Sequence, residues 1–101
     1  MRINEALPVG TVIKLKEVEK RVVIIGILQQ SEENEKIEIY DYIGVPYPEG
    51  FLDMDTTVLF QQTAIENIFS VGYSDIERQI FISDMKKQLG EENIGNMEEN
   101  I

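Results

Sequence analysis

The side chains of this chain that could do chemistry are carboxylates, amines, hydroxyls and phenols, because its 101 residues include neither histidine nor cysteine. Histidine is the commonest general base near neutral pH, and thiolates are common nucleophiles and zinc ligands. Catalysis would therefore rest on carboxylates and tyrosines. We expect a protein that is not an enzyme and uses no cofactor. A carboxylate-based enzyme is the least favoured reading, which a deep cleft lined by Asp41 and Tyr42 would revive.

Carboxylates gather in two short stretches, and calcium is the cation that such oxygen ligands would suit. One stretch holds Glu32, Glu33 and Glu35, and the other holds Asp53 and Asp55. Neither has the glycine and terminal glutamate at the spacing of a calcium-binding loop. The glycines stand singly rather than grouped before a helix, so no phosphate-binding loop is indicated. We expect neither a metal site nor a nucleotide site.

Aromatic side chains surround a proline-rich stretch and form the group best suited to binding. Exposed tyrosines beside a rigid turn are effective anchors at protein interfaces, whereas buried ones would cap a core. We expect Tyr40 and Phe51 to lie in the core, and Tyr42 and Tyr47 to contact a partner.

A helix is predicted over residues 75–89. Ser74 opens a pattern in which a glutamate follows three residues later, as in a capping box, and Gly90 supplies the usual stop. Ile76 and Ile80 fall on one side of this helix, and they either lie beneath a loop or offer a contact surface for a partner or for self-association. The opposite side carries Phe81, Ile82, Met85 and Leu89.

Three strands are predicted before the helix. Over residues 9–16 the side chains alternate in a way typical of a strand with one buried face, and the phase expected to pack inward is Val9, Thr11, Ile13 and Leu15. Residues 22–28 are apolar almost throughout, as in a central strand covered on both faces, and Gly26 predicts a bulge, a sharp bend or a close approach by another segment. Residues 37–45 form the third strand, and Asp41 interrupts its apolar phase, which consists of Ile37, Ile39, Ile43 and Val45. A register shift would turn Asp41 to water, or Asp41 lies at the edge of the core with a partner; we favour the first.

Polar or proline-rich segments connect these elements. Residues 29–36 predict a solvated loop, and residues 45–51, with two prolines and a glycine, predict a rigid turn. A short helical turn and a strand are expected over residues 63–73, whereas residues 53–62 stay ambiguous. The whole predicts a single α+β domain over residues 1–90: a curved antiparallel sheet, either simple or an SH3-like open barrel, with a C-terminal α-helix. Residues 91–101 predict a flexible acidic tail.

The charge of the chain narrows the choice of partner. Nineteen acidic residues against nine basic ones give a formal net charge of −10, which repels nucleic acid. A basic or apolar protein partner is favoured, although excess acid also simply keeps a small protein soluble. No apolar run suits a signal peptide or a bilayer span, so we expect a cytoplasmic protein with no membrane insertion.

Four stretches together resemble one family. They are residues 7–12 (LPVGTV), 23–26 (VIIG), 40–50 (YDYIGVPYPEG) and 69–75, which contains Gly72 and Tyr73. The family is a domain of unknown function in small proteins of Gram-positive bacteria, often encoded beside LXG polymorphic toxins and type VII (ESX-like) secretion genes. The resemblance spans about residues 7–89, with residues 17–20 departing where glycines are usual and residues 61–64 where an acidic capped turn is usual.

The resemblance implies a secretion-accessory, chaperone-like or toxin-associated role in the cytoplasm. It brings no activity, no cofactor and no catalytic residue. We therefore expect the chain to bind a toxin or secretion component and keep it soluble, folded or correctly delivered. The main alternative is an immunity protein that blocks a toxin with its acidic surface.

Overall fold

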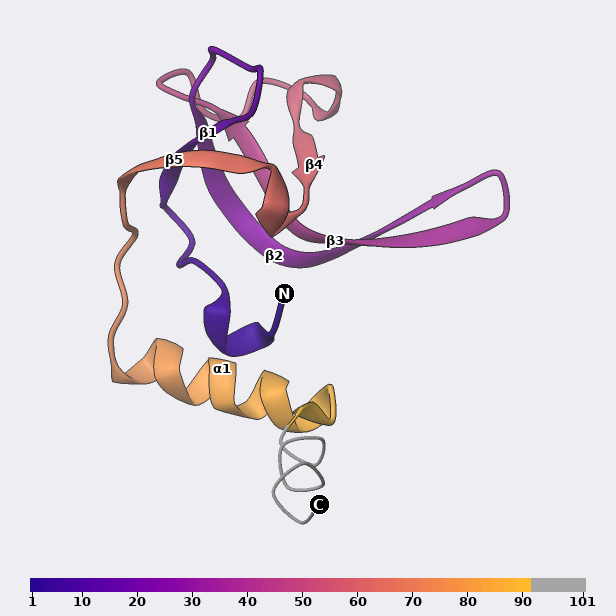
Figure 1. Ribbon diagram of the computed structural model, residues 1–101, viewed down its shortest axis with the longest axis vertical. Helices are drawn as coiled ribbons and strands as arrows, with labels where there is room; N and C mark the ends of the chain where they lie inside the picture. The colour runs from indigo at the N-terminus through magenta and orange to yellow at the C-terminus, as the bar shows by residue number, and fades with distance from the viewer. Residues whose placement is uncertain (92–101) are drawn as a thin grey trace. The chain divides into compact units, whose positions relative to one another are not determined.

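The computed structural model describes residues 1–91, which divide into two compact units. Unit 1 combines residues 1–6 with the described segment from residue 74, and unit 2 spans residues 7–73. Unit 1 holds the 3-10 helix η1 (Ile3–Glu5) and the α-helix α1 (Ile76–Gln88) (Figure 1). The five strands found among the described residues belong to unit 2, and together with α1 they confirm the expected α+β class. The expectation of one domain over residues 1–90 stays a prediction.

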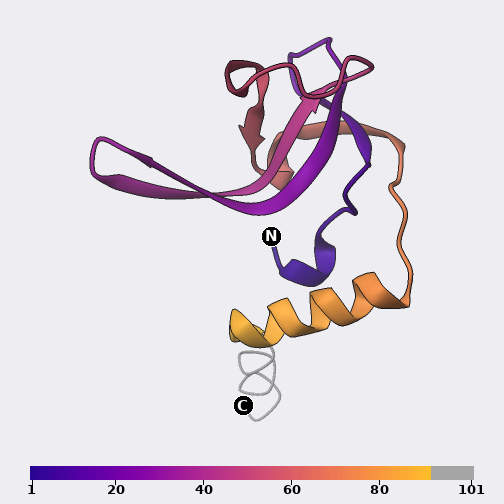
Figure 2. The same cartoon turned by 180° about the vertical axis from the view of Figure 1, so that it is seen from behind.

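Unit 2 is an antiparallel sheet in the order β4-β3-β2-β1-β5. The sheet is curved (Figure 2). It is also open, because β4 and β5 form its two edges and do not pair with each other. The segment whose structure the sequence left ambiguous, residues 53–62, contains the 3-10 helix η2 (Met54–Thr56) and strand β4. The 3-10 helix η3 (Gln62–Ala64) and strand β5 lie where a short helical turn and a strand were expected. The strands are β1 (Val12–Leu15), β2 (Val22–Glu33), β3 (Lys36–Pro46), β4 (Val58–Phe60) and β5 (Ile65–Ser70).

The core of unit 2 gathers side chains from four strands. The predicted inward phase of the first strand is confirmed, since Thr11 is buried together with the core residues of β1. Val9 was expected to share that phase but is exposed, because the chain turns at Pro8, whose carbonyl accepts the N–H of Thr11 at 3.1 Å. Strand β1 therefore begins later than expected. The core comprises Ile13, Leu15, Val22, Ile24, Tyr42 and Phe60.

Strand β2 is bent and is not covered on both faces as expected. Ile24 is fully buried, but its neighbour Ile25 is 43% exposed, because an antiparallel sheet can leave one face to solvent. The bulge predicted at Gly26 is confirmed by a register shift between Ile24 and Gly26 in the pairing with β3. Leu28 then adopts a left-handed backbone with φ of 51°, which bends the strand again.

The segment expected to be a solvated loop, residues 29–36, is a strand pair instead. Only Asn34 and Glu35 turn the chain, with φ of 52° and 66°, as the favoured two-residue hairpin turn requires. Residues 29–40, which we call the arm, pair β2 with β3 from Gln29 opposite Tyr40 to the turn. The polar composition misled the prediction because strands with solvent on both faces need no apolar alternation.

The arm extends past the part of the sheet where other strands pair with β2 and β3. Strand β1 pairs with β2 at Val22 and Val23, and β4 pairs with β3 from Tyr42 to Gly44. Both ribbon views show β2 and β3 continuing together away from the other strands of unit 2 (Figures 1 and 2). Unit 2 therefore has two regions: a five-stranded body and a two-stranded arm.

Asp41 marks the boundary between these regions. Its carboxylate accepts the N–H of Gln62 at 2.7 Å, and its own N–H donates to the side-chain oxygen of Gln61 at 3.1 Å. The favoured expectation that Asp41 faces water is therefore wrong, and the alternative of a partnered carboxylate at the edge of the core is correct. The partners supply the hydrogen bonds that make its partial burial tolerable.

Helix α1 confirms the predicted helix with one change at its start. Asp75 rather than Ser74 is the N-cap, and its carboxylate accepts the N–H of Arg78 at 3.1 Å. Gly90, with φ of 75°, ends the helix as expected. Among the described residues, none of the helices has the length and apolar character needed to cross a bilayer.

Polar contacts that the sequence did not indicate join the two segments of unit 1, in which Ile3, Ala6 and Ile82 are buried. The guanidinium of Arg78 donates to the carbonyl of Ala6 at 2.8 Å. Both carboxylate oxygens of Glu91 accept the N–H of Ile3 at 3.0 Å. Glu91 therefore contacts η1 rather than beginning a free tail, and the remainder of that expected tail, residues 92–101, lies outside the described residues.

Candidate protein-interaction surface

Tyr42 was expected to contact a partner, but it is completely buried. Its ring packs on Phe60, with ring centroids 5.4 Å apart. Its hydroxyl oxygen accepts the N–H of Leu7 at 2.9 Å, and the hydroxyl donates to the side-chain oxygen of Gln62. Tyr42 therefore joins three distant segments of unit 2 and offers no surface to a partner.

The other three residues expected to bind a partner are exposed. Tyr47 lies just after β3, in the turn that contains the cis Tyr47–Pro48 peptide. Ile76 and Ile80 lie one turn apart on α1, so they belong to unit 1 and Tyr47 belongs to unit 2. Phe51 was expected in the core but is exposed. The binding roles of Tyr47, Ile76 and Ile80 stay predictions.

Two of the stretches that carry the family resemblance meet at Thr11. Its hydroxyl donates to the carbonyl of Pro8 at 2.6 Å and accepts the N–H of Gly72 at 2.9 Å. A Cβ at Gly72 would lie 3.0 Å from the nitrogen of Thr11 and closer still to the backbone of Val9. Only glycine allows the two segments to approach this closely.

The other two stretches meet where β2 pairs with β3. Ile24 lies opposite Gly44, and a Cβ at Gly44 would lie 3.0 Å from the carbonyl of Val23 and closer to the side chain of Val22. The carbonyl of Ile24 also accepts the N–H of Gly10 at 2.8 Å. The four stretches thus pack against one another in the body of the sheet. This packing accounts for the glycines in them without a binding site.

Both departures from the resembled family have a structural counterpart. Glu17, in the first turn, has φ of 64°, a conformation that suits glycine best. In the second departure, the side-chain amide of Gln61 donates to the carbonyl of Ile39 at 3.0 Å, and Gln62 accepts the Tyr42 hydroxyl. These two glutamines therefore hold β3 in place.

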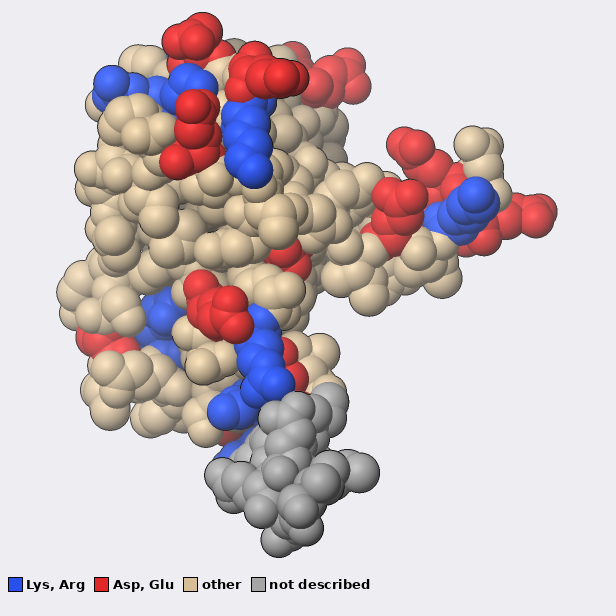
Figure 3. Space-filling view, viewed as in Figure 1, with Lys and Arg blue, Asp and Glu red and all other residues tan. Residues whose placement is uncertain are grey.

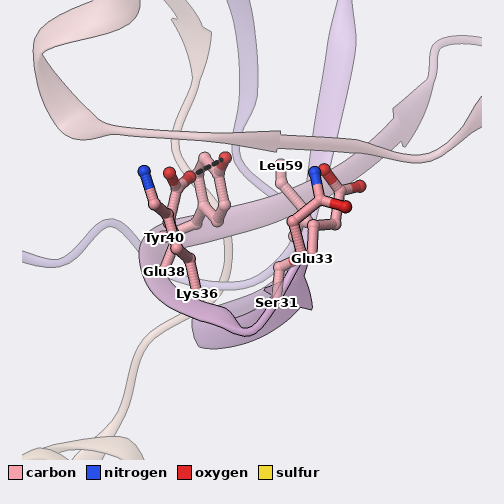
Figure 4. A pocket seen from close by; sticks show the side chains of 7 residues that line it. Ser31, Glu33, Lys36, Glu38, Tyr40 and Leu59 are labelled. Atoms are coloured by element: carbon pink, nitrogen blue, oxygen red, sulfur yellow. Dashed lines mark hydrogen bonds between the residues drawn. The ribbon is translucent and has the colours of Figure 1, made fainter.

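One face of the arm borders a hollow of about 250 Å³. The hydroxyl of Tyr40 donates to the carboxylate of Glu38 at 2.7 Å, and this bond raises the pKa of Tyr40 above its ordinary value of 10.0. Figure 4 shows this pair at one side of the hollow, with Glu33 at the other. The hollow offers carboxylate acceptors and an amine to a ligand. Its lining is Ser31, Glu33, Asn34, Lys36, Glu38, Tyr40 and Leu59.

The opposite face of the arm carries two isoleucines. Ile37 and Ile39 alternate with the residues that line the hollow, so they point to the other side of the sheet. They are 61% and 62% exposed, and their cross-strand neighbours are Glu32 and Gln30. We call Ile37 and Ile39 the arm isoleucines. The sequence placed them in the apolar phase of a strand, and the structure shows that this phase meets solvent along the arm.

The acidic stretches have other roles in the structure. Within residues 1–91, no group of three or more acidic side chains is arranged to hold a metal ion. Asp53 instead caps η2, because its carboxylate accepts the N–H of Thr56 at 2.9 Å. Glu32, Glu33 and Glu35 follow one another along the arm and its turn, where alternation sends neighbouring side chains to opposite faces.

Comparison with curated proteins and with solved structures finds no match in either set. A family model, described as a domain of unknown function (DUF4176), matches residues 6–81. The matched range contains all five strands and the first part of α1. Since the match covers well over half of the chain, the protein belongs to the DUF4176 family.

Proposed function

We propose that this protein is a non-catalytic binding factor that keeps a toxin or secretion component of a type VII system soluble, folded or correctly delivered. The observation that carries the proposal is the grouping of exposed apolar side chains on unit 2. The arm isoleucines share one face, and Phe51, Leu52 and Met54 follow one another in the segment after β3. Single exposed apolar residues are ordinary, whereas grouped ones are typical of contact surfaces.

The type of partner is suggested by the family resemblance. Proteins resembling this chain are often encoded beside LXG toxins and type VII secretion genes, which makes those products the first candidates. The net charge of −10 favours a partner that is apolar or basic. We place this binding in the cytoplasm, before the partner is exported.

Co-expression tests the proposal directly. The full chain, carrying a tag, is produced together with the toxin and secretion proteins encoded beside it, and the mixture is separated by size-exclusion chromatography with light scattering. We expect one of these proteins to co-elute with the chain and to be less soluble when the chain is omitted. A chain that elutes alone as a monomer in every combination would contradict the proposal.

A second candidate function is that of an immunity protein, and the acidic surface favours it. Carboxylates occupy much of the end of the arm, where Figure 3 shows red side chains beside blue ones. Such a surface could cover the basic substrate-binding site of a toxin. Survival of toxin-producing cells with and without the chain separates the two functions, because an escort need not protect the cell. Inhibition of the purified toxin at equal concentration would favour immunity.

A further inference from the structure

We infer that the arm is the part of unit 2 that docks the partner, through the face that carries Ile37 and Ile39. The occupant is a segment of a different protein whose contact surface is apolar and bordered by lysine or arginine. This inference rests on the proposed function and specifies which surface performs it. Neither Tyr47 nor the isoleucines of α1 are part of it.

The first argument is that the arm isoleucines have no cover within their own sheet. Within residues 1–91, the arm takes part in strand pairing only between its own two strands, since β1 and β4 pair with the body. Two-stranded hairpins are marginally stable in water, and a third element against one face is the usual remedy. Isoleucines on a face that meets only solvent would add nothing to folding, whereas under a partner they become buried.

The second argument is the charge around those isoleucines. Between residues 32 and 38 the chain carries four glutamates and one lysine, and Glu32 lies directly opposite Ile37 on the same face. A second copy of the arm would bring like charges together, which disfavours self-association through this face. A basic border on the partner satisfies the carboxylates while its apolar centre covers the isoleucines.

The third argument is that the arm is anchored at its base and closed by a favoured turn. The amide of Gln61 donates to the carbonyl of Ile39 and accepts the N–H of Asp41, so it continues the edge of β3 where β4 ends. The left-handed residues Asn34 and Glu35 match the twist of the two strands. A face held in this way loses less conformational freedom on binding.

The test uses the partner protein that co-elutes with the full chain in the co-expression experiment, purified separately. The variant Ile37→Thr/Ile39→Thr removes apolar surface and keeps β-branched side chains that favour strands. The matched control is Val18→Thr/Val71→Thr, which makes the same kind of change at two exposed apolar residues of unit 2 that lie outside the arm. We expect the arm variant to raise Kd at least tenfold, and the control to change it less than threefold.

A second variant removes negative charge and leaves both arm isoleucines in place. Glu32→Gln/Glu35→Gln should raise Kd several-fold at low salt and weaken the dependence of Kd on salt concentration. Hydrogen exchange of the wild-type complex should slow at the amides of residues 29–40 beyond those of β5. These two measurements decide the inference even where the threonine variant unfolds.

The outcomes separate this inference from the proposed function. If the wild-type chain binds the partner and the arm variants bind it equally well, the docking site is wrong and the proposed function stands. If the wild-type chain binds none of the co-expressed proteins, both fail. A chain that dimerises alone, and becomes monomeric on Ile37→Thr/Ile39→Thr, would show that the occupant is a second copy and would overturn the inference.

Discussion

Tyr42 and Tyr40 lie two residues apart on β3 and on the same face, yet they have opposite environments. Tyr42 is completely buried and is held by Leu7 and Gln62, which lie far away in the sequence. Tyr40 is only partly buried, and its hydroxyl bonds Glu38 two residues away. The difference arises because the body surrounds β3 with strands and connecting segments, whereas the arm supplies only β2. The body depends on distant contacts, and the arm depends on local ones.

The largest expected difference in stability between body and arm is seen when one isoleucine in each is truncated to alanine. Ile24→Ala removes a fully buried side chain from the body and should lower the free energy of unfolding by about 2–5 kcal/mol. Ile39→Ala removes an exposed one from the arm and should change it by about 0.5 kcal/mol or less. Urea unfolding followed by circular dichroism measures both. Equal losses would break the distinction between body and arm.

The second-largest effect on stability is expected in the body, where the backbones of Val9 and Gly72 lie close together. Gly72→Ala places a Cβ against the backbone of Val9, so the two segments must move apart, at a cost of about 1–3 kcal/mol. The exposed neighbour gives a control, Val71→Ala, which should change stability little. Thermal unfolding of the two variants provides the measurement. A Gly72→Ala protein as stable as the wild type would show that the two segments can separate freely.

The tyrosine pair itself gives a smaller effect. Tyr42→Phe leaves the N–H of Leu7 and the side chain of Gln62 without the hydroxyl, at a cost of about 1–2 kcal/mol. Tyr40→Phe removes an exposed hydrogen bond between residues two apart and should change the free energy of unfolding less than Tyr42→Phe does. Denaturant midpoints compare the two. A larger loss of stability in Tyr40→Phe than in Tyr42→Phe would contradict the distinction between body and arm.

The smallest expected effect is a shift in titration on the arm. The bond to the Glu38 carboxylate raises the pKa of Tyr40, because it stabilises the protonated phenol. This contribution to stability is present below pH 10.0 and is lost as the pH rises through the folded-state pKa. Glu38→Gln should lower the pKa of one tyrosine in an ultraviolet titration, and Tyr40→Phe identifies which one. An unchanged titration in Glu38→Gln would mean that the bond does not persist in solution.

The sequence-based assignment of side chains to core or surface was wrong mainly where it depended on which face of a strand or turn is covered. Tyr42 was assigned to the surface and Phe51 to the core, and the structure reverses both. Alternation divides a strand into two faces but does not say which one other elements will cover. The arm isoleucines show the same limit. They belong to the apolar phase of a strand, which predicts burial, but no other element of the sheet covers them.

Local chemistry in the sequence determined the order of the elements. Capping, glycine and side-chain alternation act over a few residues. They predicted the helix near residues 75–89, the bulge at Gly26 and strands within residues 9–16, 22–28 and 37–45. Only the tertiary structure decided that polar residues 29–36 form strands, and that Tyr42 is buried while Ile39 is exposed. Those outcomes depend on partners such as Leu7 and Gln62, because burial is set by which distant segments meet.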